Sequence, residues 1–261
     1  MSQQSQQRSV ATTFLARSIP IVIMLMDFSF RGFKWTTTPS PFWHFVAVRL
    51  RRSLVMGKSL SFVRPQMQFE TECERNDRLI ALVRESQWMM DALITVRSLG
   101  LASWCIGAGA VRNLVWDAIH EKLEPSELAD VDVAYFDAKC LVSEQDEDLQ
   151  AKLSAALPGV PWEVTNQAAV HLWFEQHFGN PVPPLSSLED AVASWPEYAT
   201  SVGIRLELDN SITVIAPHGL EDLFACVVRR NPVRVSVNTY RQRVEQKRYS
   251  ARWPRVQVVP C

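Results

Sequence analysis

A glycine turn between two patterned segments is the first feature that could do chemistry. Gly107-Ala108-Gly109 follows a short apolar run at 103–106 and precedes a helical pattern at 110–119. Glycine lets the backbone approach a phosphate closely, and the following helix N-terminus would offer unpaired N–H groups and a positive dipole end. The turn alone also fits a dinucleotide or methyl-donor site, although the dinucleotide pattern requires a third glycine where Arg112 stands. A turn that binds no ligand is the remaining alternative.

Two aspartates further along the chain could hold a cation. In Asp130-Val131-Asp132-Val133 the acids alternate with valines, which predicts a strand in an apolar sheet. Residues two positions apart on a strand point to the same face, so both carboxylates would project together. Like charges this close repel each other unless cations neutralise them, and Mg²⁺ suits the task because it is hard, oxygen-seeking and usually shared with phosphates. The alternative is a polar strand edge that faces solvent.

A third carboxylate, Glu163, lies between Trp162 and Val164 on the next expected strand. Neighbouring strands lie about 4.8 Å apart, so Glu163 could reach the same cation. The alternative is an outward-facing glutamate on an alternating strand. Each of the three signals is weak alone. They lie in order on consecutive expected strands, however, and this order favours one joint site.

The elements that must position these residues are helices alternating with short strands. We expect strands at 103–106, 131–136 and 162–165, a hairpin of 204–208 and 212–215, and helices at 72–98, 110–119, 143–157, 169–178, 220–228 and 240–249. This order predicts an α+β fold with α/β-like character, in which helices flank a small mixed sheet.

The first 66 residues differ from the rest in charge. Residues 1–66 carry nine Arg or Lys and one acid, a net charge of +8, whereas residues 67–261 carry eighteen Arg or Lys and twenty-seven acids, a net charge of −9. We expect 1–66 to be an N-terminal extension that is disordered or arises from a start codon mis-assigned upstream of Met56 or Met67. A targeting segment is a third alternative. We expect 67–261 to form the folded domain, with a helical and basic C-terminal part.

Composition also bounds the partners and the location. An acidic body does not favour nucleic acid as a partner, because neutralising phosphates needs a net basic surface. The basic residues between Arg229 and Arg248 are interpreted as a solvated helix face, with contact to an acceptor's phosphates as the alternative. The apolar run at 21–30 is shorter than the roughly 20 residues of a membrane span, so no membrane partner is expected. Five widely spaced cysteines without zinc-site spacing fit a reduced, cytoplasmic protein.

The order of glycine turn, acid pair and third acid resembles the polymerase-beta-type nucleotidyltransferase superfamily. The turn at 107–113 followed by 130–133 is similar to the head domain of CCA-adding enzymes. From about Leu79 to Val259 the chain resembles an uncharacterised family of bacterial and fungal nucleotidyltransferase-like proteins. The phrases that carry this resemblance are Ile106 to Asn113 with Trp116-Asp117, Asp130 to Asp137, Pro161 to Gln167 with His171-Leu172-Trp173, Ser194 to Glu197, Val202 to Arg205, Ala216-Pro217, Gly219 to Phe224 and Arg252-Trp253-Pro254.

The resemblance implies a polymerase-beta-type core and Mg²⁺-dependent transfer of a nucleoside monophosphate from an NTP, such as ATP, to an acceptor. Asp130 and Asp132 would hold two Mg²⁺ ions, one lowering the pKa of the attacking hydroxyl and one neutralising the departing pyrophosphate. Glu163 would complete the first ion's site and serve as base. The nucleotide contacts would come from Gly107, Ala108, Gly109, Arg112 and Asn113. The acceptor stays open: a small molecule, a protein or RNA.

Two departures from the superfamily pattern bear on nucleotide geometry more than on metal binding. Ala108 stands where the superfamily has a glycine, and Asn113 replaces an acid often found after the arginine in CCA-adding enzymes. One alternative is therefore a nucleotide-binding protein that keeps the fold without the chemistry. The other is a methyl-donor or dinucleotide enzyme that uses the glycine turn, but such a site has no evident use for Asp132 and Glu163 together.

Overall fold

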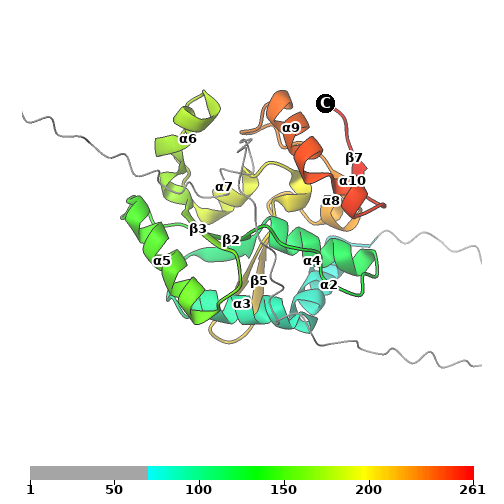
Figure 1. Cartoon of the computed structure of the whole chain (residues 1–261), viewed down its shortest axis with the longest axis horizontal. Coiled ribbons are helices and arrows are strands. Elements are labelled where there is room, and N and C mark those ends of the chain that lie inside the picture. The colour runs from blue at the N-terminus through cyan, green and yellow to red at the C-terminus, as the bar shows by residue number, and fades with distance from the viewer. Residues whose placement is uncertain (1–69) are drawn as a thin grey trace, which may run out of the picture.

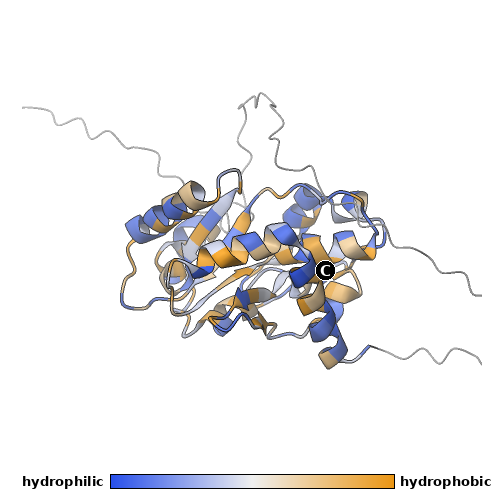
Figure 2. Ribbon diagram, turned by 90° about the horizontal axis from the view of Figure 1, so that it is seen from below, coloured by the Kyte–Doolittle hydropathy of each residue, from blue (hydrophilic) through white to orange (hydrophobic). Residues whose placement is uncertain are grey.

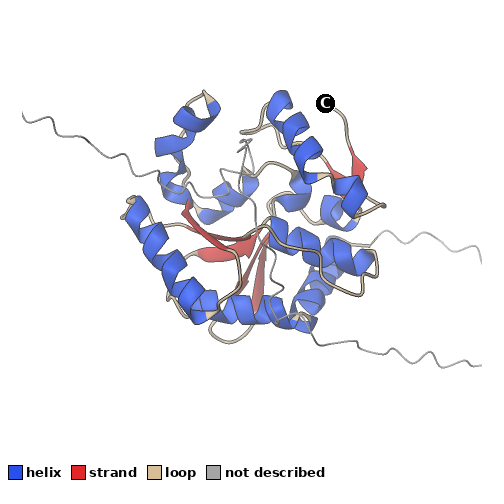
Figure 3. Ribbon diagram, viewed as in Figure 1, coloured by secondary structure: helices blue, strands red, loops and turns tan. Residues whose placement is uncertain are grey.

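The computed structural model describes residues 70–261, so the expected extension at 1–66 and its boundary at residue 67 lie outside the described residues. A five-stranded sheet with the order β3-β2-β1-β4-β5 occupies the centre of the fold. Helices surround this sheet, as Figures 1 and 3 show. The expected α+β fold with a small mixed sheet is confirmed.

The sheet combines one parallel pair with three antiparallel pairs. Its strands are β1 (Trp104–Gly107), β2 (Val131–Tyr135), β3 (Trp162–Asn166), β4 (Gly203–Leu206) and β5 (Ile212–Ile215). Strands β2 and β3 are parallel, whereas β1 pairs antiparallel with β2 and β4, and β4 pairs antiparallel with β5. The parallel pairing sets Asp132 opposite Glu163. Paired residues of neighbouring strands share a face, so both acids lie on the same side of the sheet.

The helices have local reasons for their bounds. They are α2 (Glu72–Glu85), α3 (Gln87–Arg97), α4 (Gly109–Ile119), α5 (Ser143–Ala156), α6 (Val170–Phe178), α7 (Leu188–Ala193), α8 (Glu221–Phe224), α9 (Val237–Lys247) and α10 (Tyr249–Arg252). Thr71 and Glu74 form a reciprocal capping box that starts α2. Hydrophilic and hydrophobic residues share the helices (Figure 2), as amphipathic helices around a core require. No helix within residues 70–261 is long and apolar enough to cross a membrane.

The two faces of the sheet have different neighbours. Val131, Val133 and Val164 belong to the main core, which includes residues of α2, α3, α4 and α5. Ala134 of the opposite face belongs to a smaller cluster with Trp195. Because Asp132 alternates with the two valines along β2, it lies on the face of this smaller cluster. The main core therefore stabilises one face, and the acids occupy the other.

Two expected helices differ from the observed elements. The helix expected at 220–228 ends as the four-residue α8, because Cys226 adopts φ +55° and the next two residues form β6 (Val227–Val228). Strand β6 pairs in parallel with β7 (Gln257–Val258), a contact far along the chain that local periodicity does not reveal. The helix expected at 240–249 is interrupted by Arg248, whose φ of +48° separates α9 from α10.

Candidate active site

The turn from β1 into α4 places a strained residue beside the acids. Ala108 has φ +50° and ψ −115°, a backbone region that residues with a Cβ rarely adopt. Its N–H donates to the Val202 carbonyl at 3.1 Å, and its carbonyl accepts from the Arg112 N–H at 3.1 Å. These two bonds hold the conformation at a cost of about 1–3 kcal/mol. The turn is therefore built in the geometry of glycine, although the residue there is alanine.

The two glycines of the turn have different roles. A Cβ on Gly107 would lie 2.5 Å from the Trp195 ring and 2.9 Å from the Val202 carbonyl oxygen, so close packing demands glycine there. A Cβ on Gly109 would lie 3.5 Å from Asp130 Oδ1, which is an ordinary contact distance. Gly109 thus marks the place where the start of α4 meets the acid pair.

The acids are buried, so the alternative interpretation of a polar strand edge that faces solvent is wrong. Asp130, Asp132 and Glu163 are 4%, 1% and 3% exposed. Both carboxylate oxygens of Asp132 and Oδ2 of Asp130 have no hydrogen-bond partner among residues 70–261. Buried carboxylate oxygens without partners are costly. Their donor chemistry fits a hard cation such as Mg²⁺.

Asp132 titrates far from its ordinary range. Burial raises its pKa to about 7 and the charge of Asp130 adds to this effect, whereas Lys247, Arg243 and Arg112 oppose it. Within residues 70–261, however, no group of three His, Cys, Asp or Glu side chains is arranged to hold a metal ion. The structure thus places Asp130 beside the glycine turn and Asp132 in register with Glu163, but it does not gather all three acids into one ligand set.

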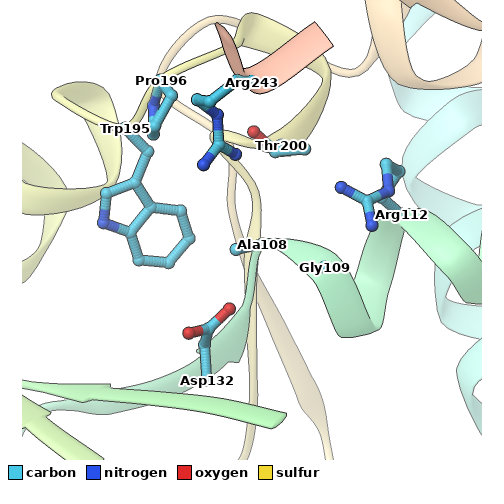
Figure 4. Close-up of a pocket in the computed structure, with 8 residues that line it drawn as sticks. All are labelled: Ala108, Gly109, Arg112, Asp132, Trp195, Pro196, Thr200 and Arg243. Atoms are coloured by element: carbon cyan, nitrogen blue, oxygen red, sulfur yellow. The ribbon is translucent and has the colours of Figure 1, made fainter. Parts of the chain in front are cut away.

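A pocket lies above the buried acids. It is lined by Ala108, Gly109, Arg112, Asp132, Trp195, Pro196, Thr200 and Arg243. Asp132 enters from β2, and the Arg243 guanidinium points toward it from the opposite side (Figure 4). The pocket therefore has an acidic floor and cationic walls, an arrangement that suits a cation bound together with an anionic ligand.

Arg112 is held rigidly in the pocket wall. It is 4% exposed, so its side chain does not face solvent. Its guanidinium lies 5.7 Å, 5.3 Å and 5.6 Å from the ring centroids of Trp116, Tyr249 and Trp253. Asn113 Oδ1 accepts from its Nε at 3.2 Å and from its Nη2 at 2.8 Å. Asn113 does not line the pocket, and its visible role is to orient Arg112.

Sequence patterns missed a buried polar junction on the far wall. Glu197, 0% exposed, accepts from Arg243 Nε at 2.6 Å and Nη2 at 3.1 Å. Thr200 Oγ1 donates to it at 2.8 Å and the Tyr249 hydroxyl at 3.3 Å. Burial alone would raise the pKa of Glu197, but Arg243 and Thr200 outweigh burial and hold that pKa below its ordinary value.

The basic C-terminal cluster is not a uniformly solvated helix face, because Arg243 and Lys247 turn inward. Arg243 is buried and Lys247 is half-buried. Burial, Arg243 and Arg112 lower the pKa of Lys247 to about 8, although Asp130 and Asp132 act in the other direction. Tyr240, Arg243 and Lys247 recur at helical spacing on one face, but the same spacing also fits a solvated face, so this signal alone does not reveal that the face turns inward.

Comparisons with known proteins bear on the family and the fold. A family model described as nucleotidyltransferase matches residues 94–258. A structure described as a CCA-adding enzyme head domain, solved by NMR, aligns with a TM-score of 0.60 and 30% identity over 71% of this chain and 96% of that chain. A tRNA-processing enzyme in its apo form I aligns with a TM-score of 0.39 and 18% identity, over 70% of this chain and 44% of that chain.

The first two matches carry the assignment. The tRNA-processing enzyme is too dissimilar to support an argument, and this chain spans less than half of its length. A comparison with curated protein sequences gave no match. The family model covers most of the chain, and the head domain is matched over nearly its full length. This chain belongs to the nucleotidyltransferase family.

Proposed function

We propose that this protein transfers a nucleoside monophosphate from an NTP to a hydroxyl group of an acceptor in a Mg²⁺-dependent reaction. The observation that carries the proposal is the buried pair of Asp130 and Asp132, three of whose carboxylate oxygens have no hydrogen-bond partner among residues 70–261. A metal ion bound with a triphosphate would neutralise these acids and fill the pocket beside them.

The residues divide into a metal-binding and a phosphate-binding side. Asp130 and Asp132 would hold the two ions, and Glu163, in register with Asp132, would complete one site. Bound ions of this kind lower the pKa of an attacking hydroxyl and neutralise a departing pyrophosphate. The N–H groups at the start of α4 and the guanidinium of Arg112 would bind phosphate oxygens. Asn113 would keep that guanidinium in place.

The acceptor is a small molecule, a protein side chain or RNA. RNA is considered as an acceptor because of the similarity to a CCA-adding enzyme head domain. The net charge of −9 over residues 67–261 disfavours an extended nucleic-acid surface. We therefore rank a small molecule or a protein hydroxyl above RNA, and propose that residues 67–261 form the catalytic domain of a cytoplasmic enzyme.

Calorimetry and pyrophosphate release test this function together. Wild-type protein, Asp130→Asn, Asp132→Asn and the double variant would be titrated with each of the four NTPs, with and without Mg²⁺. Asp148→Asn, on the exposed face of α5, is the matched control. We expect Mg²⁺-dependent NTP binding by the wild type and the control, and its loss in the double variant.

The same measurements separate the alternatives. Pyrophosphate release would be followed with small hydroxyl compounds, a hydroxyl-containing protein mixture and tRNA as acceptors. NTP binding that is independent of Mg²⁺ in every variant would instead indicate a nucleotide-binding protein without the chemistry. Thermal stabilisation by S-adenosylmethionine or a dinucleotide alone would contradict the proposal.

A further inference from the structure

Within the part of the chain that the structure describes, two cationic side chains in and beside the pocket lack an acidic partner. Among residues 70–261, Arg229, Arg205 and Arg243 each pair with a carboxylate. Arg112 and Lys247 make no ion pair within this part of the chain. A buried cation without a counter-charge is unfavourable in the free protein and becomes favourable when an anion binds.

Lys247 approaches the pocket from α9. It lies one helical turn after Arg243, which lines the pocket, and residues four apart on a helix share a face. It also lies two residues before Tyr249, whose ring contacts the Arg112 guanidinium. The charges of Arg112, Asp130 and Asp132 all act on its amine. Lys247 is thus close enough to both pocket arginines and to both aspartates for their charges to act on it.

The chemistry of these groups indicates a polyphosphate. Arg112 offers a planar fork fixed by three aromatic rings, and such a fork matches phosphate oxygens in two-point contacts. Lys247 offers a compact charge on a flexible stem, which can follow a second phosphate. The start of α4 adds N–H donors nearby. Two separate cationic groups beside helix N–H donors therefore suit consecutive phosphates better than a single carboxylate.

We propose that Arg112 and Lys247 bind the β- and γ-phosphates of the NTP, so that α9 completes the active site. The proposal rests on the proposed function, because it assigns contacts to the same substrate. It gives the C-terminal basic cluster a place inside the catalytic pocket. Arg243 has a different part, since Glu197 already neutralises its charge, and it positions α9 against the pocket wall.

Titration with inorganic tripolyphosphate tests the site without nucleoside or metal. Calorimetry would compare the wild type with Lys247→Met, Lys247→Arg and Lys152→Met, an exposed lysine on α5. Loss of one charge-assisted contact is expected to weaken binding of tripolyphosphate by about tenfold or more in Lys247→Met. Lys247→Arg keeps the charge and is expected to stay within about threefold of the wild type, and Lys152→Met is expected to match it.

A nucleotide series separates phosphate binding from a structural role. Lys247→Met is expected to weaken ATP in the presence of Mg²⁺ by the same factor, while leaving the affinity for AMP unchanged, because AMP has no β- or γ-phosphate. An equal loss for AMP and ATP would overturn the proposal, as would wild-type affinity of Lys247→Met for tripolyphosphate, or no tripolyphosphate binding by the wild type.

The two proposals can fail separately. In one outcome, Lys247→Met loses affinity for tripolyphosphate while the wild type releases no pyrophosphate with any acceptor. That result would support the phosphate-binding site and contradict the transfer reaction. If the wild type transfers nucleotide and Lys247→Met has unchanged affinity for tripolyphosphate and unchanged KM for the NTP, the reaction stands and the assignment of Lys247 is overturned.

Discussion

Replacing Asp132 by asparagine should change the stability of the metal-free protein in a pH-dependent way. The folded protein raises the pKa of Asp132 from an ordinary value of 3.8 to about 7. As pH rises above 4, the unfolded chain loses this proton first, so folding becomes less favourable until about pH 7 and the cost stays constant above it. At about 1.4 kcal/mol for each tenfold change in proton affinity, the full cost is about 4 kcal/mol, an upper limit for a buried pair of acids.

The substitution is best judged by how the difference in unfolding free energy between the wild type and Asp132→Asn changes between two pH values. At pH 5 little more than a third of this cost is present. Between pH 5 and pH 8 the free energy of unfolding of the wild type should therefore fall by up to about 3 kcal/mol relative to that of Asp132→Asn. The asparagine amide also lacks partners in the buried site, at a cost of about 1–3 kcal/mol. That cost is the same at both pH values and cancels in the comparison. The stability of the variant relative to the wild type should therefore increase as pH rises.

Urea denaturation with a metal chelator measures this difference. The wild type, Asp132→Asn and the exposed control Asp148→Asn would be unfolded at pH 5 and pH 8. Adding Mg²⁺ at pH 8 should then stabilise the wild type and leave Asp132→Asn unchanged, because the ion neutralises the aspartate. Equal effects of the substitution at the two pH values would refute the reasoning that burial and Asp130 suppress ionisation of Asp132.

Three further substitutions test the turn and the polar junction by urea denaturation. Ala108→Gly removes about 1–3 kcal/mol of backbone strain and adds about 0.4–1 kcal/mol of unfolded-state entropy, so a net gain of about 1 kcal/mol is expected; a loss would contradict the strained geometry. Gly107→Ala would press a Cβ into the Trp195 ring and the backbone behind it, and is expected to lower stability by about 1–3 kcal/mol, whereas wild-type stability would show that the ring has room to move. Glu197→Ala leaves Arg243 buried without its counter-charge and is expected to cost about 3–5 kcal/mol; a cost below 1 kcal/mol would mean that water reaches the guanidinium.

The sequence could predict the strand that presents Asp130 and Asp132 because its pattern is local. Alternation of Asp130 and Asp132 with valines specifies a strand and a shared face within four residues. The partner strand is not local information. That β3 runs parallel to β2 with Glu163 opposite Asp132 depends on how the intervening helix packs. The expectation of a third nearby acid rested on strand order, and the resemblance supplied its role.

The residues of the polar junction could not be predicted for a different reason: their contact depends on tertiary packing. Glu197 and Arg243 are separated by 46 positions. Glu197 lies in one of the segments that carry the family resemblance, but nothing local in either segment pairs it with Arg243. Charged residues at helical spacing describe a solvated face and an inward-facing cationic face equally well, so only tertiary packing distinguishes them. The positive φ of Ala108 is hidden for a similar reason, because alanine has no sequence signature for that conformation.

The junction at Glu197 also determines how the pocket can move. Its carboxylate joins the segment 196–200 to α9 and α10, and its backbone bridges to Arg230. Separating these walls would expose a buried charge and break several hydrogen bonds at once. We therefore expect the two pocket walls to move together as one rigid unit instead of opening about a hinge. Their amide hydrogens are expected to exchange with solvent in one cooperative opening, so that substrate enters a cavity already shaped for it.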